Sequence, residues 1–181
     1  MKDDFQRAQD AIASLRLTGH NRDLAGQWLS FWKNGKPPPL ETYRRLTWLH
    51  TEATMISRIV RGKSLECVSA GPYLNLAMNF DLAGKDILTL VPPDQRDVLL
   101  SHWWEVAEGA VSLTYREFKP KESAPGIAQN LGLPFSGEEA DGARHVLMHS
   151  NWRPSGSSWI AGNVETGMLA STRQLARFRG P

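Results

Sequence analysis

The sequence predicts an α+β protein in which a five-stranded antiparallel sheet carries helices on one face and is preceded by amphipathic helices. Two observations support this fold class. Residues 53–60 alternate and are rich in β-branched residues, and residues 65–69 return as a second strand after the polar turn 61–64. So short a connection requires antiparallel pairing. After an intervening helical stretch, residues 111–152 contain three further strand patterns.

Residues 3–33 predict two amphipathic helices. In residues 3–17 the apolar side chains recur at spacings of three and four, which places them on one side of a helix: Phe5, Ala8, Ile12 and Leu15. A second helix runs from Arg22 or Asp23 to Lys33 and carries a heavier stripe, namely Leu24, Trp28, Phe31 and Trp32. Two heptads are too few for a convincing coiled coil, so the first helix must bury its stripe against its own domain or against a second copy. We expect a homodimer through these N-terminal helices.

Three consecutive prolines, residues 37–39, separate the helical segment from the rest of the chain, because they favour a stiff extended spacer. The sequence therefore divides into an N-terminal helical extension and proline linker, residues 1–39, a main domain, residues 40–164, and a basic C-terminal tail, residues 165–181. We expect the tail to form a short helix followed by a disordered end. Its positive charge comes from Arg173, Arg177 and Arg179.

The main domain begins with a short helix over residues 41–50, followed by the strand pair. Gly71-Pro72 then opens a helical region. Pro92-Pro93-Asp94 begins a long helix that ends at Gly109, because proline is tolerated in the first turn and acidic side chains favour the positive end of the helix dipole. Three strands follow at residues 111–118, 127–133 and 144–152. A shorter strand pattern at residues 159–164 either follows them or extends the third.

Composition favours one globular domain with extensions, since 41% of the 181 residues are hydrophobic and 22% are charged. The formal net charge of +2 gives no basic footprint, so we expect no nucleic-acid partner. Cys67 is the only cysteine, which excludes an intrachain disulfide and favours a reducing cytoplasm. The N-terminus lacks a signal-peptide core, and no run approaches the roughly 20 apolar residues that cross a bilayer. We therefore expect a cytoplasmic protein without membrane insertion.

The histidines do not form a metal motif. His145 and His149 have the i, i+4 spacing of helical zinc ligands, but their segment predicts a strand, in which the two rings start about 13 Å apart. His50-Thr51-Glu52 resembles the HxE of zinc deaminases, whose later pair of cysteines is missing here. We predict no metal site.

Hydrolase and nucleotide-triphosphatase motifs are missing from the sequence as well. There is no GxSxG elbow, and Gly84-Lys85 is followed by Asp86, whose carboxylate would repel a phosphate. Cys67 lies in an apolar strand and is expected to be an inert core residue. We predict that the protein is not an enzyme. The rival hypothesis, an enzyme acting on a small metabolite, uses four residues as acid or base: His102, His149, Tyr115 or Glu117.

Laid in order, these segments resemble the PAS fold from about Thr54 to Val164. Residues 65–91, LECVSAGPYLNLAMNFDLAGKDILTLV, resemble its strand-to-helix core. The sequence DLAGQWLSFWKNGKPPPLE followed by RRL is similar to the lead-in of a bacterial PAS-like subfamily. The resemblance implies a sensor or adaptor that acts through a small molecule bound between sheet and helices, through a signalling protein partner, or through both. It does not specify a cofactor, because PAS-type domains bind haem, flavin or metabolites, or bind only proteins.

On this resemblance, the elements expected to line a ligand site carry six polar or aromatic candidates: Tyr73, Asn75, His102, Trp103, Tyr115 and His149. The seven tryptophans indicate a core rich in indoles or a pocket lined by them. In haem-binding members of the family a histidine from the helix side ligates iron, so a haem-binding sensor that uses His102 is an alternative. The helical motif around a reactive cysteine that flavin photoreceptors carry is absent, because Cys67 lies in a strand. Ligand binding is expected to shift the packing of the N-terminal helix.

Overall fold

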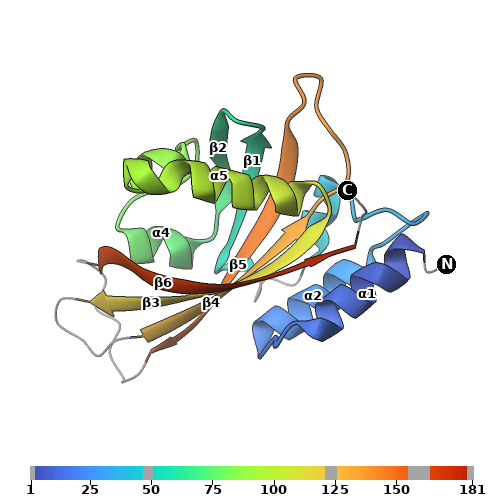
Figure 1. Ribbon diagram of the computed structural model, residues 1–181, viewed down its shortest axis with the longest axis horizontal. Coiled ribbons are helices and arrows are strands. Elements are labelled where there is room, and N and C mark those ends of the chain that lie inside the picture. The colour runs from blue at the N-terminus through green and yellow to red at the C-terminus, as the bar shows by residue number, and fades with distance from the viewer. Residues whose placement is uncertain (1–2, 47–50, 121–125, 155–163, 179–181) are drawn as a thin grey trace.

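A computed structural model describes residues 3–46, 51–120, 126–154 and 164–178, which build one antiparallel sheet with helices on both faces (Figure 1). The strands are β1 (Thr54–Val60), β2 (Ser64–Ala70), β3 (Ala110–Pro120), β4 (Gly126–Pro134), β5 (Arg144–Pro154) and β6 (Val164–Arg177). Their order across the sheet is β2-β1-β5-β4-β3-β6, and all neighbours are antiparallel. The five predicted strands are confirmed, and a sixth extends the sheet beyond β3.

One face of the sheet carries the helices that connect β2 to β3. They are α4 (Pro72–Met78), the short 3-10 helix η2 (Ile87–Leu90) and α5 (Pro93–Ala107). Helix α5 lies across the sheet and contacts β1, β3, β4 and β5 (Figure 1). Pro93 stands at its start and Gly109 follows its end, as the sequence predicts.

The opposite face carries α1 (Asp4–Ser14) and α2 (His20–Ser30), which lie side by side beneath the sheet in Figure 1. Helix α1 contacts β3 and β6, and α2 contacts β4 and β5. Asp3 caps α1, because its side chain accepts a hydrogen bond from the Gln6 backbone N–H at 2.8 Å. The predicted helix over residues 41–50 is a 3-10 helix, η1 (Leu40–Arg45), and residues 47–50 lie outside the described part of the chain.

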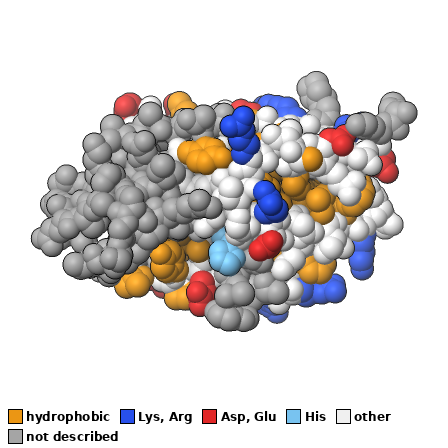
Figure 2. Space-filling view, turned by 90° about the horizontal axis from the view of Figure 1, so that it is seen from below, with side chains coloured by type: hydrophobic (Ala, Val, Ile, Leu, Met, Phe, Trp, Pro, Cys, Tyr) orange, Lys and Arg blue, Asp and Glu red, His pale blue; other side chains and the backbone are white. Residues whose placement is uncertain are grey.

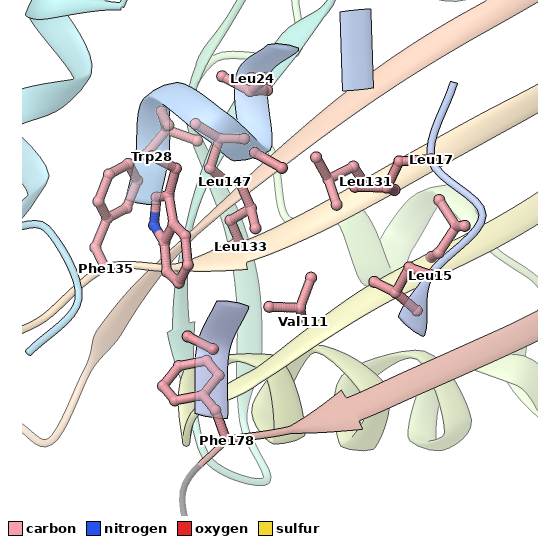
Figure 3. Close-up of a cluster of buried hydrophobic side chains, with 14 residues drawn as sticks. Leu15, Leu17, Leu24, Trp28, Val111, Leu131, Leu133, Phe135, Leu147 and Phe178 are labelled. Carbon is pink, nitrogen blue, oxygen red and sulfur yellow. The ribbon is translucent and has the colours of Figure 1, made fainter. Parts of the chain in front are cut away.

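The apolar stripes of α1 and α2 are buried against the sheet of their own chain. Figure 3 shows this cluster, in which Leu24 and Trp28 of α2 meet Leu131, Leu133 and Leu147 of the sheet. Leu15 and Leu17, which follow α1, complete it together with Val111, Phe135 and Phe178. The Trp28 indole N–H donates to the Pro134 carbonyl at 2.9 Å, so this large side chain is buried without losing its hydrogen bond.

Two further clusters fill the space between the sheet and its other helices. The first is built around α5 and contains Ile59, Leu65, Leu88, Leu100, Trp103, Val106, Ala107 and Val146. The second lies under α4 and contains Met55, Cys67, Leu74 and Leu82. The sheet is therefore the central layer of three, with apolar side chains on both faces.

The C-terminal segment differs from its prediction. Residues 164–177 form strand β6, paired with β3 from Ala110 to Pro120, so the predicted helix after residue 164 is wrong. Pairing with β3 supplies backbone hydrogen bonds that outweigh the weak helical preference of this stretch. Of the strand predicted at residues 159–164, all but Val164 lies outside the described residues.

Candidate functional site

A row of polar side chains crosses the side of the sheet that faces α4 and α5. Asn130 of β4 is paired in register with Ser150 of β5 and with Thr114 of β3. The Ser150 hydroxyl donates to Asn130 Oδ1 at 2.5 Å, and both residues are buried. We call Thr114, Asn130 and Ser150 the helix-facing row. Its orientation follows from Gly132, two residues along β4 from Asn130, which lies against the Trp103 ring of α5.

The surroundings of the helix-facing row are apolar. Met148, two residues before Ser150, packs against both apolar clusters on this side, and its partner on β1 is Met55. Ser57 of β1 adds a buried hydroxyl for which the described residues provide no hydrogen-bond partner. A few polar groups set in an apolar wall are the usual composition of a small-molecule site.

The opposite side of the same strands carries a second set of polar groups, which joins the sheet to the connection between α1 and α2. We call it the polar seam. It consists of Thr18 and Asn21 from the connection and from α2, and of four side chains of the sheet, Tyr115, Gln129, His149 and Asn151.

Gln129 is the centre of the polar seam. Its Oε1 accepts from the Thr18 backbone N–H at 3.3 Å, from the Thr18 hydroxyl at 3.2 Å and from Asn21 Nδ2 at 3.0 Å. Its Nε2 donates to the Arg16 carbonyl and to the Tyr115 hydroxyl, both at 3.0 Å. Because Gln129 is only 6% exposed, these bonds replace water that the folded protein excludes.

The seam also fixes the tautomer of His149. The backbone carbonyl of Gln129 can only accept a hydrogen bond. The Asn21 side-chain nitrogen Nδ2 therefore faces this carbonyl at 2.9 Å, and Asn21 Oδ1 faces His149. The His149 ring nitrogen Nδ1, 2.7 Å from that oxygen, must therefore carry the proton and donate it. Asn21 and His149 are 0% and 2% exposed, so this bond is shielded from solvent.

The helix-facing row and the polar seam lie back to back. Gln129 and Asn130 are neighbours in β4, and His149 and Ser150 are neighbours in β5, with Asn130 and Ser150 paired. Successive side chains of a strand point to opposite faces, so one short stretch of backbone carries both sets. A displacement of these strands on one side must therefore move donors and acceptors on the other.

The six predicted site residues divide between these two faces. Tyr115 and His149 belong to the polar seam, on the side of α1 and α2. His102 and Trp103 belong to α5 on the other side; both are buried, and their ring centroids are 5.2 Å apart. The acid and base candidates His102, His149 and Tyr115 thus do not meet at one point, and the side chain of Glu117 lies outside the described part.

Tyr73 and Asn75 lie on α4. Asn75 Oδ1 accepts from the Leu82 backbone N–H at 3.1 Å, and its Nδ2 donates to Asp81 at 3.2 Å, so it braces the turn after its own helix. Tyr73 is half-buried, and burial raises the pKa of its hydroxyl. Neither contact involves the helix-facing row, and ligand binding by these two residues stays a prediction.

Asn21, Gln129, Asn130 and Ser150 were not predicted as site residues. The signal that could have found them is the presence of polar pairs inside strands predicted to be buried, Gln129-Asn130 in one and Ser150-Asn151 in another. A buried polar side chain requires a partner, so such pairs point to a network or a ligand.

Two other groups of titratable side chains have structural roles. Arg58 of β1 forms ion pairs with Glu139 and Asp141 in the connection between β4 and β5, and the hydrogen bond from Arg58 lowers the pKa of Asp141. Cys67 is fully buried, and burial, followed by the charges of Asp81 and Glu66, raises the pKa of its thiol to about 11. A thiol with that pKa is a poor nucleophile at neutral pH.

The described part of the face seen in Figure 2 carries mixed charges. Figure 2, which views the molecule from below, shows Lys and Arg side chains scattered among Asp and Glu and uncharged surface on the described part of that face. No group of three metal-ligating side chains occurs among the described residues. Within the same residues, every helix is too short or too polar to span a bilayer.

Comparisons with known proteins give structural neighbours only. No family model and no curated protein matches the sequence. A PAS domain of an HTR-like protein from Haloarcula marismortui has 16% identity and a TM-score of 0.37, covering 62% of this chain and 93% of that one. A sensory box sensor histidine kinase from Vibrio cholerae has 18% identity and a TM-score of 0.34, and the match covers 60% of this chain and 87% of the kinase chain. An RNA-binding light-oxygen-voltage receptor has 14% identity and a TM-score of 0.38, covering 81% of this chain and 47% of the receptor.

The order of the described elements defines the fold. Two antiparallel strands, a helical segment laid over the sheet and three further strands follow one another in the order that the sequence predicted from its resemblance to the PAS fold. The described fold is PAS-like, with an additional strand and two N-terminal helices.

Proposed function

We propose that this PAS-like domain is a cytoplasmic sensor or adaptor that acts through a small molecule held at the helix-facing row, through a protein partner, or through both. Its output is the docking of residues 4–30, the N-terminal arm, on the opposite face of the sheet. The observation that carries the proposal is the back-to-back placement of the row and the polar seam on β4 and β5.

The row suits a ligand with at least one polar group. Asn130 presents an amide with both donor and acceptor capacity, and Ser150 presents a hydroxyl beside it. A ligand group that bonded to Asn130 would compete with the Ser150 hydroxyl, and the two strands would adjust. Because Gln129 and His149 are the adjacent residues, that adjustment would lengthen or tighten the bonds that hold Thr18 and Asn21. The ligand would thereby shift the population of docked arms.

The arm is also the proposed contact to partners. Its apolar stripe is buried on the sheet when docked and becomes available to another protein, or to a second copy, when released. The proposed domain boundaries follow this division, with residues 1–39 as the responsive extension and residues 40–164 as the sensing domain; residues 165–181, most of which form β6, add a strand to its sheet.

Native mass spectrometry of the purified full-length chain tests the ligand proposal. We expect a co-purified organic mass, or one acquired from a metabolite extract, that Asn130→Leu removes. Gln6→Ala, which changes an exposed side chain of α1 outside the polar seam, is the control and should retain it. The row would not be a ligand site if both variants retained the same bound mass, or if the wild type acquired no added mass after incubation with extract. A Soret band that His102→Ala removes would favour the haem alternative.

A further inference from the structure

We infer that the N-terminal arm is exchangeable between two copies of this chain, so that the arm of one copy docks on the sheet of the other. The inference deepens the proposed role of the arm as output and rests on it for its biological meaning. Two features of the molecule support arm exchange: the specificity of the docking surface, and the segment that joins the arm to the sheet.

The docking surface accepts only an arm of this sequence. An apolar helix from another protein could cover Leu131, Leu133 and Leu147, but it would leave Gln129 and His149 buried without their partners. An unsatisfied buried polar group is costly, and this cost discriminates against wrong occupants. The arm of a second copy presents Thr18 and Asn21 at the required positions and satisfies the seam completely.

The segment that joins the arm to the sheet is a short exposed turn at residues 33–36. Lys33 and Lys36 exchange backbone hydrogen bonds of 3.4 and 3.0 Å across Asn34 and Gly35, whose φ angles are 53° and 68°. These two positions need the left-handed conformation that Asn and Gly tolerate best. The direction in which the arm leaves the sheet therefore depends on this one turn.

The chain is anchored again directly after the turn. The Ser136 backbone N–H donates to the Pro38 carbonyl at 2.9 Å, and Pro37 and Pro38 are buried. Opening the turn thus redirects the arm while the chain after Pro37 stays anchored on the sheet. The arm gives up its contacts with the segment around η1, among them that of Arg45 with the Phe31 ring at 4.9 Å. When extended, the five residue steps from Trp32 to Pro37 reach about 17 Å, enough to present the arm to a neighbouring molecule.

An exchanged dimer would be closed and two-fold symmetric. Each sheet would receive the arm of the other copy through the same contacts as in the monomer, so no new surface is needed. The balance between closed monomer and exchanged dimer is then set by the turn, because the docking contacts are identical in both.

Light scattering of size-fractionated protein over a range of concentrations tests the inference. Gly35→Val strains the turn at positive φ without a steric clash, since no atom lies within 4 Å of an added Cβ. Because an exchanged dimer relieves the strain in the turns of both copies, we expect the dimer association constant to rise about a hundredfold. Gly62→Val is the matched control, because Gly62 has φ +66° and equally open space in the turn between β1 and β2, and it should leave the constant unchanged.

Two further measurements keep the inference testable if Gly35→Val folds poorly. Inserting two glycines after Gly35 relaxes the turn and should lower the dimer fraction below that of the wild type. Mixing Thr18→Cys chains with Asn151→Cys chains and adding a short bismaleimide should join two different chains, because Asn151 Nδ2 contacts the Thr18 carbonyl at 3.2 Å. The native thiol of Cys67 is buried and does not compete.

The results that would overturn arm exchange are equal dimer fractions in Gly35→Val and Gly62→Val, or dimers in which the mixed chains do not cross-link. Neither result depends on a ligand. A failure of arm exchange is therefore distinguishable from a failure of the ligand site, which is tested by the retained mass.

Discussion

Replacing Gln129 by alanine should loosen the N-terminal arm. The substitution removes all five side-chain hydrogen bonds of Gln129. Asn21 keeps its bond to the backbone carbonyl of residue 129, and the Arg16 carbonyl keeps the Tyr115 hydroxyl at 3.3 Å, so the main losses are the partners of the Thr18 backbone N–H and of the Thr18 hydroxyl. At about 1–3 kcal/mol for each unsatisfied buried group, we expect the free energy of unfolding to fall by about 2–4 kcal/mol.

Urea unfolding measures this loss, and amide hydrogen exchange locates it. Gln6→Ala is the control, because the Gln6 side chain bonds only to the side chain of Asp10 at the surface and should change stability by less than about 0.5 kcal/mol. In Gln129→Ala, amides of residues 4–30 should lose protection before those of β1 and β5. A loss below about 1 kcal/mol, or equal loss of protection in the arm and in β1, would refute the assignment of Gln129 as the centre of the seam.

Three further predictions concern single groups. Cys67 should resist iodoacetamide in the folded protein at pH 7.5 and react only in urea, because burial holds the pKa of its thiol near 11; fast labelling of the folded protein would contradict this. Burial lowers the pKa of His145, so the unfolded chain binds its proton more readily and the free energy of unfolding should fall as the pH drops below about 6.5. His145→Gln should remove that part of the pH dependence, as urea titrations at pH 5.5 and 7.5 would show. Gly132→Ala should cost about 1–3 kcal/mol, since its Cβ would lie 2.3 Å from Ser112 Oγ and 2.8 Å from the Trp103 ring, whereas Gly26→Ala on the open surface of α2 should stabilise the protein by about 0.5–1 kcal/mol. A wild-type melting temperature in either variant would contradict the prediction for that variant.

The strand and helix order of the main domain was predictable because each element carries its own local signal. Residues 53–60 alternate as a half-buried strand does, and Pro93 and Gly109 delimit α5. The C-terminal strand was not predictable in this way. Residues 164–177 contain Leu, Ala, Gln and Arg, which favour a helix, and only the unpaired edge of β3 makes them a strand.

The candidate site was predicted less well than the fold. Sequence patterns identified His149 and Tyr115 as polar groups on strands, but the face to which each points depends on register. Asn21, in the first turn of α2, is a partner of both His149 and Gln129, and Thr18 of the preceding connection also bonds to Gln129; both lie more than a hundred residues away in the sequence. Contacts of that separation are set by tertiary packing and leave no trace in a single sequence.

Coupling between the two faces of β4 and β5 can be measured by hydrogen exchange of the arm in variants of the helix-facing row. Asn130→Ala and Ser150→Ala change side chains that have no bond to the arm among the described residues. If the two faces are coupled, both variants change the exchange rates of amides in residues 4–30 severalfold. Arg58→Ala, which breaks ion pairs elsewhere on the sheet, does not change these rates. Exchange in the arm that stays at the wild-type rate, while only residues 126–134 and 144–154 respond, would contradict it.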